Sequence, residues 1–256
     1  MVSEKMEKAL KERQFCIYVQ PKYDVCSEAI VGGEALVRWM HPEKGMISPG
    51  VFIPIFEKNG FIIQADYYIW EETCRILSEL KKKGISGYPI SINVSRAHFY
   101  GSELKDKLLE LIQKYELQPR DLELEITETI CVEDPEVIYS KMRELQSLGF
   151  FIAMDDFGSG YSSLNMLKEM PLDIIKMDLK FLDGGDNEAK SRYILKTLII
   201  LAQEMDLKVV VEGVETKQQV EFLRTIGKNY VQGFYFSRPI DGSLYKEMLE
   251  KYHSEK

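Results

Sequence analysis

The sequence has few cysteines, and no two of them lie close together. Four cysteines in 256 residues lack the paired spacings of a disulfide framework or of a cysteine-based zinc site. The three histidines also show no ligand spacing. We therefore expect ordinary core thiols in a reducing compartment. The cysteines are Cys16, Cys26, Cys74 and Cys131, and the histidines are His41, His98 and His253.

An excess of basic residues and a long apolar run are also missing. The formal net charge is -8, and no basic run with interleaved aromatic residues occurs, which disfavours binding to DNA or RNA polymers. The most apolar helical stretch, Tyr193 to Met205, is interrupted by Lys196 and Gln203, so it is too short and too polar to span a membrane. With no signal-peptide pattern, we expect a soluble cytoplasmic protein without a membrane segment. A phosphate-bearing ligand would then need local positive charge.

The chain alternates between short apolar runs and segments of helical period. Tyr67 to Lys83 and Pro135 to Leu148 show the helical period. No Pro- or Ser-rich linker divides the chain, so residues 1–256 are expected to form a single domain. Eight strands that alternate with helices predict an α/β fold, a (β/α)8 TIM-like barrel. The candidate strands are Phe15 to Gln20, Ile30 to Arg38, Pro89 to Val94, Leu122 to Ile126, Phe150 to Asp155, Asp173 to Met177, Lys208 to Val211 and Tyr230 to Gly233.

The first two strands are joined too closely for a parallel pair. Seven residues lie between Pro21 and Ala29, whereas a parallel crossover needs roughly a dozen. We therefore expect the first strand to run antiparallel to the rest. Residues 1–13 precede it, and Ser3 to Arg13 has the pattern of a helix.

Helix boundaries carry their own signals. Asp134 and Pro135 suit the cap and first position of one helix, and Gly149 suits its end. Thr216 and Gln219 predict a capping box at the start of another.

The stretch from Phe150 to Leu164 places two adjacent carboxylates after a buried strand. Asp155 and Asp156 follow five apolar residues, and a turn built on Gly158 and Gly160 comes next. Two anions at the end of a buried strand repel each other unless one is protonated or a cation lies between them. The pair therefore indicates a metal site, although a helix cap or a solvent-facing position also explains two adjacent aspartates.

Other polar residues also occur late in apolar strands. Barrel enzymes place their chemistry at this end of the strands. Taken singly, Asn93 or Gln232 could be a satisfied core polar group. Together the set supplies oxygen ligands, which suit Mg²⁺ or Mn²⁺ better than zinc. Its members are Glu34, Asn93, Glu125, Asp155, Asp156, Lys176, Asp178, Glu212 and Gln232.

These residues carry a family resemblance over nearly the whole chain. The segment from Gly33 to Trp39, preceded by Gln20 and Pro21, resembles the signature of EAL domains, the cyclic di-GMP phosphodiesterases. The later motifs occur in the family's order. They are Asn93-Val94-Ser95, Glu125 to Glu128, Asp155 to Tyr161, Lys176-Met177-Asp178, Glu212 to Glu215 and Gln232-Gly233-Phe234. The departures, at Phe56, Val211 and Ser159, touch no implied ligand.

The resemblance implies a barrel with an antiparallel first strand and a site with two Mg²⁺ or Mn²⁺ ions. It implies one ion on Glu34, Asn93, Glu125 and Asp155, and a second on Asp155, Asp156 and Glu212. It further implies catalytic roles for Lys176, Glu212 and Asp156. The implied substrate contacts are Gln20, Leu36, Arg38, Asp178 and Gln232, and the implied regulatory loop contains Glu128, Phe157, Gly158 and Gly160. Trp39 is interpreted as core, with base stacking as the alternative.

The implied activity is hydrolysis of one phosphodiester bond of cyclic di-GMP to linear 5′-pGpG, which ends second-messenger signalling. The family also leaves open a homodimer, and a cyclase-like or sensor domain in a longer parent chain. Two other functions stay open. One is a catalytically silent cyclic di-GMP receptor. The other is an enolase-type lyase or racemase, for which the expected capping domain is missing.

Overall fold

The computed structural model describes residues 2–132, 134–158, 164–179 and 188–255. The chain folds into two compact units. Unit 1 comprises Met1–Gln20, Gly33–Leu122 and Pro239–Lys256, and unit 2 comprises Pro21–Gly32 and Glu123–Arg238. The chain passes from one unit to the other within strands β1 (Phe15–Asp24) and β2 (Ile30–His41), so each unit contains a part of both strands.

Unit 1 contains both helices and strands. The long helix α3 (Ile62–Lys82) buries an apolar stripe that includes Ile69, Trp70 and Leu77, as an amphipathic helix on a core does. Helix α2 (Pro49–Asn59) has a proline in its first turn and is capped at its end by Gly60, whose φ of 77° suits glycine. Besides α2, α3 and its parts of β1 and β2, unit 1 contains α1 (Val2–Lys11), β3 (Gly45–Ile47), β4 (Ile90–Asn93), α4 (Arg96–Tyr100), α5 (Leu104–Lys114), η1 (Pro119–Asp121), β10 (Ile240–Asp241) and α10 (Gly242–Ser254).

The strands of unit 1 pair in both directions. β2 and β3 form an antiparallel hairpin in which Trp39 lies opposite Ile47. β2 runs parallel to β4, with Glu34 opposite Ser91. The first part of β1 pairs antiparallel with β10. β2 therefore lies beside β4 in the parallel orientation that places the carboxyl ends of both strands at one edge.

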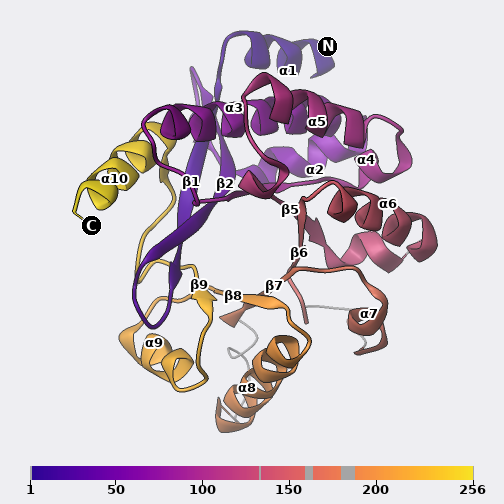
Figure 1. The fold of residues 1–256 in the computed structure, drawn as a ribbon. Helices are drawn as coiled ribbons and strands as arrows, with labels where there is room; N and C mark the ends of the chain where they lie inside the picture. Colours follow the sequence, from indigo (N-terminus) through magenta and orange to yellow (C-terminus); the bar gives the residue numbers. More distant parts are fainter. Residues whose placement is uncertain (1, 133, 159–163, 180–187, 256) are drawn as a thin grey trace. The chain divides into compact units, whose positions relative to one another are not determined.

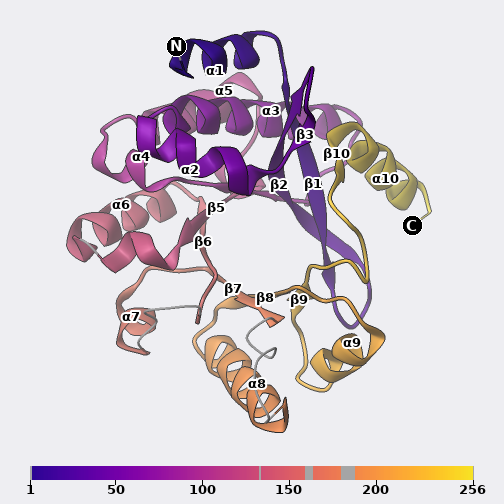
Figure 2. The ribbon, with the colours of Figure 1, turned by 180° about the vertical axis from the view of Figure 1, so that it is seen from behind.

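Unit 2 follows a regular alternation of strand and helix. Its elements, besides the parts of β1 and β2, are β5 (Leu122–Thr127), η2 (Glu128–Val132), α6 (Pro135–Ser147), β6 (Phe151–Asp155), α7 (Leu164–Glu169), β7 (Ile174–Asp178), α8 (Glu188–Glu204), β8 (Lys208–Glu212), α9 (Lys217–Arg224) and β9 (Tyr230–Val231). In both views of the ribbon, helices α6 to α9 lie on the same side of strands β5 to β9 (Figures 1 and 2).

The sheet of unit 2 is parallel from β5 to β9. Thr127 pairs with Asp155 at the ends of β5 and β6, and Asp178 pairs with Glu212 at the ends of β7 and β8. β1 pairs antiparallel with β9, with Tyr23 opposite Val231. The predicted reversal of the first strand is therefore confirmed, and its cause is the short connection after β1.

The interior of this sheet explains why its strands read as apolar runs. Ala153, Ile174 and Val210 form a buried cluster across β6, β7 and β8, and Phe151 and Tyr230 pack against it. Parallel strands are covered on both faces, so successive residues are apolar. Each fully buried Ile or Val contributes about 1.5–3 kcal/mol. This packing holds the carboxyl ends of the strands at one edge.

The structure contains strands at all eight predicted positions. The boundaries differ by a few residues, most at the first strand, which continues to Asp24. The short strands β3 and β10 were not predicted because two or three residues show no period. The predicted capping box at Thr216 and Gln219 is present, and Gly149 follows α6 with a φ of 97°.

Two local predictions are wrong. Asp134 occupies the cap position of α6, but its φ of 47° is left-handed and its side chain accepts no capping hydrogen bond. A cap residue normally has extended backbone, which aims its side chain at the first amides. Cys26 is exposed rather than a core thiol, because it lies in the turn after β1, where Asp24 accepts hydrogen bonds from the Cys26 and Ser27 amides.

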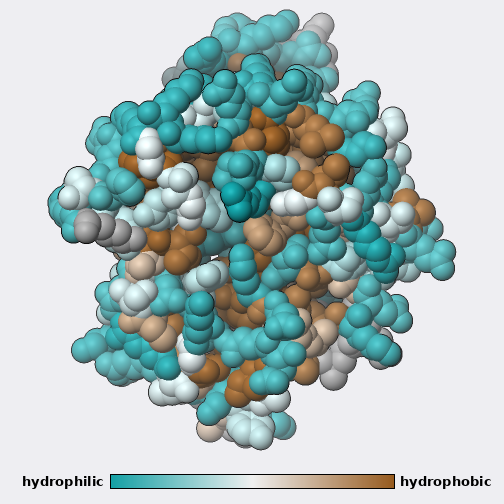
Figure 3. Space-filling model, in the orientation of Figure 1, coloured by the Kyte–Doolittle hydropathy of each residue, from teal (hydrophilic) through white to brown (hydrophobic). Residues whose placement is uncertain are grey.

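Hydrophilic residues cover most of the visible surface, and hydrophobic residues are exposed in smaller patches between them (Figure 3). Among the helices that the structure describes, none combines the length and the apolar character needed to cross a membrane.

Candidate functional site

Four charged side chains meet at the ends of β5 to β8 in unit 2. The Lys176 ammonium lies 2.8 Å from Glu125 Oε2, 3.0 Å from Asp155 Oδ1 and 2.9 Å from Glu212 Oε1. Each carboxylate comes from a different strand, and the parallel register brings them together. The Lys176 side chain is 1% exposed, so its charge is held almost entirely by protein groups. We call these four residues the Lys176 cluster.

Negative charge exceeds positive charge at this site. Asp155, Asp156 and Glu212 each offer a carboxylate oxygen, and these atoms all lie within 4.8 Å of one another. At an effective dielectric constant of about 20, two unit charges about 4 Å apart interact by about 4 kcal/mol. With Glu125 the acidic groups number four, and Lys176 offsets one charge. The donor set consists of hard oxygen atoms, which fits a divalent ion such as Mg²⁺ or Mn²⁺.

The two adjacent aspartates have different surroundings. Asp155 ends β6 and is half-buried, while Asp156 is exposed and has a left-handed φ of 55°. The Asp156 amide donates to Asp155 Oδ1 at 3.0 Å, and the Phe157 amide donates to the Lys176 carbonyl at 3.1 Å. The backbone thus turns sharply after the strand, which separates the two carboxylates and leaves both able to face one ion.

The loop that follows was predicted to be regulatory. Phe157 is buried, and Gly158 has a φ of 95°, which an L residue rarely adopts. Glu128 begins η2 directly after β5 and is buried. Gly160 lies outside the described residues.

Two predicted substrate residues are positioned by glycines. Asp178 ends β7, and a Cβ on Gly213 would lie 3.0 Å from Asp178 Oδ1. Gln232 is buried after β9, and its carbonyl accepts a hydrogen bond from the Val214 amide at 3.2 Å. The next residue, Gly233, approaches the Val214 backbone so closely that no side chain fits. Glycine at these two positions therefore lets the β8 and β9 ends pack against their neighbours.

The remaining predicted residues belong to unit 1. Glu34, Leu36 and Arg38 alternate along β2, so they share one face of that strand. Glu34 and Gln20 are buried, Leu36 and Arg38 are half-buried, and Asn93 is exposed at the end of β4.

Arg38 is held among groups of its own unit. Its Nη1 donates to the Val37 carbonyl at 3.0 Å, and its guanidinium carbon lies 5.7 Å from the centre of the Tyr18 ring. Burial lowers the pKa of Arg38, and electrostatic interactions with Tyr18 and Glu34 partly offset that effect. Arg38 nevertheless stays charged at neutral pH, as arginine does in proteins.

Two charged residues next to the Lys176 cluster were not predicted from the sequence. Lys22 on β1 and Glu123 on β5 are both buried, and Lys22 Nζ lies 2.8 Å from Glu123 Oε2 and 3.4 Å from Glu125 Oε1. Burial lowers the pKa of Lys22, but the carboxylates of Glu123 and Glu125 more than offset this, and the pKa is raised overall. The signal that could have identified Glu123 was its position two residues before Glu125 on the same strand. Lys22 gave no such signal, because it lies beyond the predicted end of the first strand.

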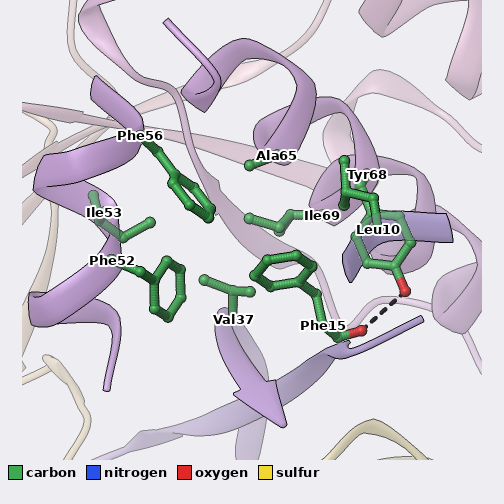
Figure 4. A pocket seen from close by; sticks show the side chains of 9 residues that line it. All are labelled: Leu10, Phe15, Val37, Phe52, Ile53, Phe56, Ala65, Tyr68 and Ile69. Carbon is green, nitrogen blue, oxygen red and sulfur yellow. Dashed lines mark hydrogen bonds between the residues drawn. The ribbon is translucent and has the colours of Figure 1, made fainter. Parts of the chain in front are cut away.

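A separate pocket in unit 1 has no such chemistry (Figure 4). Its side chains leave no space for a water molecule, and the Tyr68 hydroxyl donates to the Phe15 carbonyl at 2.9 Å. Trp39 packs beside it on Phe15 and Phe52, with ring centroids 5.2 and 5.7 Å apart, in agreement with a core role. The lining residues are Leu10, Phe15, Val37, Phe52, Ile53, Phe56, Ala65, Tyr68 and Ile69.

Comparisons with known proteins place the chain among characterised relatives. The family model described as EAL domain matches residues 3–239. The chain is 35% identical over 235 residues to the bifunctional diguanylate cyclase/cyclic di-GMP phosphodiesterase MucR of Pseudomonas aeruginosa, covering 92% of this chain and 34% of MucR. It is 34% identical over 251 residues to the cyclic di-GMP phosphodiesterase NbdA of the same organism, covering 98% of this chain and 32% of NbdA. The chain thus spans about a third of the length of these relatives.

A solved structure has a fold similar to that of this chain. The structure described as PaMucR phosphodiesterase, c-di-GMP complex, has a TM-score of 0.88 and 34% sequence identity to this chain, and the match covers 94% of this chain and 98% of that one. This likeness confirms the predicted fold class.

Proposed function

Since the chain belongs to the EAL domain family, we propose that it hydrolyses cyclic di-GMP, opening one of the two phosphodiester bonds to give linear 5′-pGpG. The observation that carries this proposal is the Lys176 cluster, in which one buried ammonium on β7 contacts carboxylates from β5, β6 and β8. Such an arrangement suits a reaction at phosphorus, because it provides anions to hold metal ions and a cation to face phosphate charge.

We propose that two Mg²⁺ or Mn²⁺ ions bind at this site. Glu34, Asn93, Glu125 and Asp155 would hold one ion, and Asp155, Asp156 and Glu212 would hold the other. When bound, the ions would lower the pKa of a water molecule and offset charge on the phosphoryl oxygens. The proximity of the Asp155, Asp156 and Glu212 oxygens supports the second set, while Glu34 and Asn93 rest on the resemblance of their motifs.

Side chains of the protein would supply the remaining catalytic functions. In the reaction, the oxygen of one water molecule bonds to phosphorus, the bond from phosphorus to one ribose oxygen breaks, and a proton passes to that leaving oxygen. Lys176 would orient the water, and the contacts of its ammonium with the Asp155 and Glu212 carboxylates support this role. Glu212 and Asp156 would complete the arrangement by accepting hydrogen bonds from that water or by ligating an ion.

Substrate binding would depend on the residues that the family resemblance implies. We propose that Arg38 binds phosphate through its guanidinium fork and that Gln20, Leu36, Asp178 and Gln232 contact the nucleotide. Arg38 is half-buried, so part of its desolvation has already occurred before substrate binds.

We further propose that residues 1–256 act as one catalytic domain in the cytoplasm. The family match runs through both units, and the described cysteines are free thiols, as in proteins of reducing compartments. A homodimer and an attached cyclase-like or sensor domain stay predictions from the resemblance.

A product assay tests the proposal. The protein is incubated with cyclic di-GMP and either Mg²⁺ or Mn²⁺, and the products are identified by mass. Linear pGpG is the expected product. Binding without turnover would instead support a silent receptor, and the absence of binding would refute both functions.

A further inference from the structure

A second buried lysine lies next to the Lys176 cluster, on the side of the amino-terminal half of β5. Glu123 and Glu125 are two residues apart on β5, so their side chains share one face of the strand. Lys22 reaches both, with Nζ 2.8 Å from Glu123 Oε2 and 3.4 Å from Glu125 Oε1. The three residues are 3%, 7% and 1% exposed in the order Lys22, Glu123 and Glu125.

Glu125 therefore has a lysine at each of its oxygen atoms. Its Oε1 faces Lys22, and its Oε2 lies 2.8 Å from Lys176 Nζ. Two cations on opposite oxygens of one carboxylate oppose rotation of that group about its terminal bond. A metal ligand needs such a fixed orientation, because second-shell partners of ligating carboxylates control both affinity and activity.

Stability alone does not account for Lys22. Placing a lysine and a glutamate in the interior costs several kcal/mol of desolvation for each ion, and apolar residues of similar volume are often as stabilising or more so. A methionine would fill a similar space without a charge. The lysine instead provides a directed contact to Glu125, and the Glu123 carboxylate, 2.8 Å from Lys22 Nζ, provides its counter-charge.

We propose that Lys22 is a positioning residue for Glu125, with Glu123 as its counter-charge. This inference rests on the proposed function, in which Glu125 is a metal ligand. Lys22 acts through Glu125 and does not itself contact the reacting atoms. Since Lys22 and Glu123 carry opposite charges, removing both leaves the net charge of the site unchanged and isolates the effect on orientation.

The test uses the double variant Lys22→Met/Glu123→Gln, the single variant Lys22→Met and the unchanged protein. Thermal unfolding measures stability, calorimetry measures Mn²⁺ affinity, and steady-state kinetics with cyclic di-GMP gives kcat and KM. Lys22→Met alone is expected to be the least stable, because it removes the ammonium that offsets the buried Glu123 charge. The double variant should recover stability.

The recovered stability of the double variant is not expected to restore the proposed metal site. We expect the double variant to bind Mn²⁺ about tenfold or more weakly and to show a similar loss in kcat, as is typical for second-shell changes, while KM changes by less than about threefold. Lys22→Arg keeps the cation and should restore much of the Mn²⁺ affinity. Lys246→Met, which removes a lysine paired with Glu79 in unit 1, is the matched control and should leave Mn²⁺ affinity and kcat unchanged.

Two results would overturn the inference. If the double variant binds Mn²⁺ and turns over like the unchanged protein, Lys22 and Glu123 are only a structural pair. If the unchanged protein binds no Mn²⁺, Glu125 has no ion to hold and the positioning role fails. A protein that binds Mn²⁺ more tightly than the double variant but leaves cyclic di-GMP intact would refute the proposed function and support the positioning role.

Discussion

Asp155 contributes to the site in two ways. It contacts the Lys176 ammonium through Oδ1 at 3.0 Å, and the same oxygen accepts a hydrogen bond from the Asp156 amide. One of its carboxylate oxygens also lies within 4.8 Å of a carboxylate oxygen of Asp156 and of one of Glu212. In the proposed function it belongs to both metal ligand sets, so no other residue can replace it.

Asp155→Asn is therefore expected to lower turnover of cyclic di-GMP by several orders of magnitude while the fold is retained. The amide keeps the shape of the side chain, and removing one anion from a like-charged group relieves repulsion in the metal-free protein. Circular dichroism and thermal unfolding check the fold, and product formation checks the rate. Asp106→Asn, at an exposed position on α5, is the matched control. Near-normal turnover in Asp155→Asn would refute the bridging role.

Glu212 and Arg38 should separate chemistry from binding. Glu212→Gln removes a negative charge at the end of β8, and this charge matters most when the nucleophile forms. We therefore expect kcat to fall by several orders of magnitude. The affinity for cyclic di-GMP should change by less than about tenfold, or about 1.4 kcal/mol. Arg38→Ala should weaken binding more clearly than kcat. Calorimetry in Ca²⁺, where turnover is expected to be blocked, measures affinity for both. Equal losses of affinity and rate in Glu212→Gln would contradict this division.

Cys74 gives a prediction for the pH dependence of stability. Burial, followed by the charges of Glu71 and Asp121, raises the pKa of this thiol from 9.0 to about 12. A folded-state pKa above the unfolded value stabilises the protein below pH 9, and this stabilisation is lost as pH rises from 9 to about 12, by up to about 1.4 kcal/mol per pH unit.

The free energy of unfolding should therefore fall more steeply with pH in the unchanged protein than in Cys74→Ala. Denaturant unfolding measured at several pH values above 8 checks this difference, and other titrating groups affect both proteins alike. Parallel curves for the two proteins would show that the Cys74 thiol ionises as readily in the folded state as in the unfolded state.

At the scale of elements, the close contact between the end of β9 and the segment after β8 holds two strand ends together. The Gln232 amide donates to the Val211 carbonyl at 2.9 Å, and the Tyr235 amide donates to the Val214 carbonyl at 3.0 Å. A Cβ on Gly233 would lie 2.1 Å from the Val214 carbonyl oxygen. Because the obstacle is backbone, the two segments would have to separate to make room.

Gly233→Ala should destabilise the protein by about 1–3 kcal/mol or more, as overpacking does, and should lower activity because Gln232 and Glu212 lie beside the displaced segments. Gly50→Ala is the matched control. It lies in α2 with Ser48 Oγ 3.9 Å away as the nearest atom, so it should be neutral or slightly stabilising. Denaturant unfolding compares the two. Equal stability of both variants would show that the contact at Gly233 yields easily.

The elements themselves were predictable because their signals are local. Apolar runs predicted the strands, and the seven-residue connection before Ala29 predicted the reversed β1. Gly149 predicted the end of α6. The paired ends of β5 to β8 also followed, since parallel strands bring their last residues to one edge. Lys22 and Glu123 were missed because their partners are far away in sequence, and a lone charged residue in a strand does not reveal what it contacts.

At the scale of the whole molecule, the family match runs through segments of both units, and the chain spans about a third of the relatives that it resembles. In the proposed function, hydrolysis of cyclic di-GMP by this chain uses a hard, compact divalent ion, since two-metal displacement needs tight oxygen geometry that the larger Ca²⁺ relaxes.

Turnover of cyclic di-GMP in water enriched in oxygen-18, followed by mass spectrometry of the product, tests this claim most directly. With Mn²⁺ or Mg²⁺, we expect linear pGpG whose terminal phosphate carries one oxygen-18 atom, since water bonds to phosphorus. With Ca²⁺ we expect bound but intact substrate. Intact cyclic di-GMP under all three ions, or equal rates with all three, would contradict it.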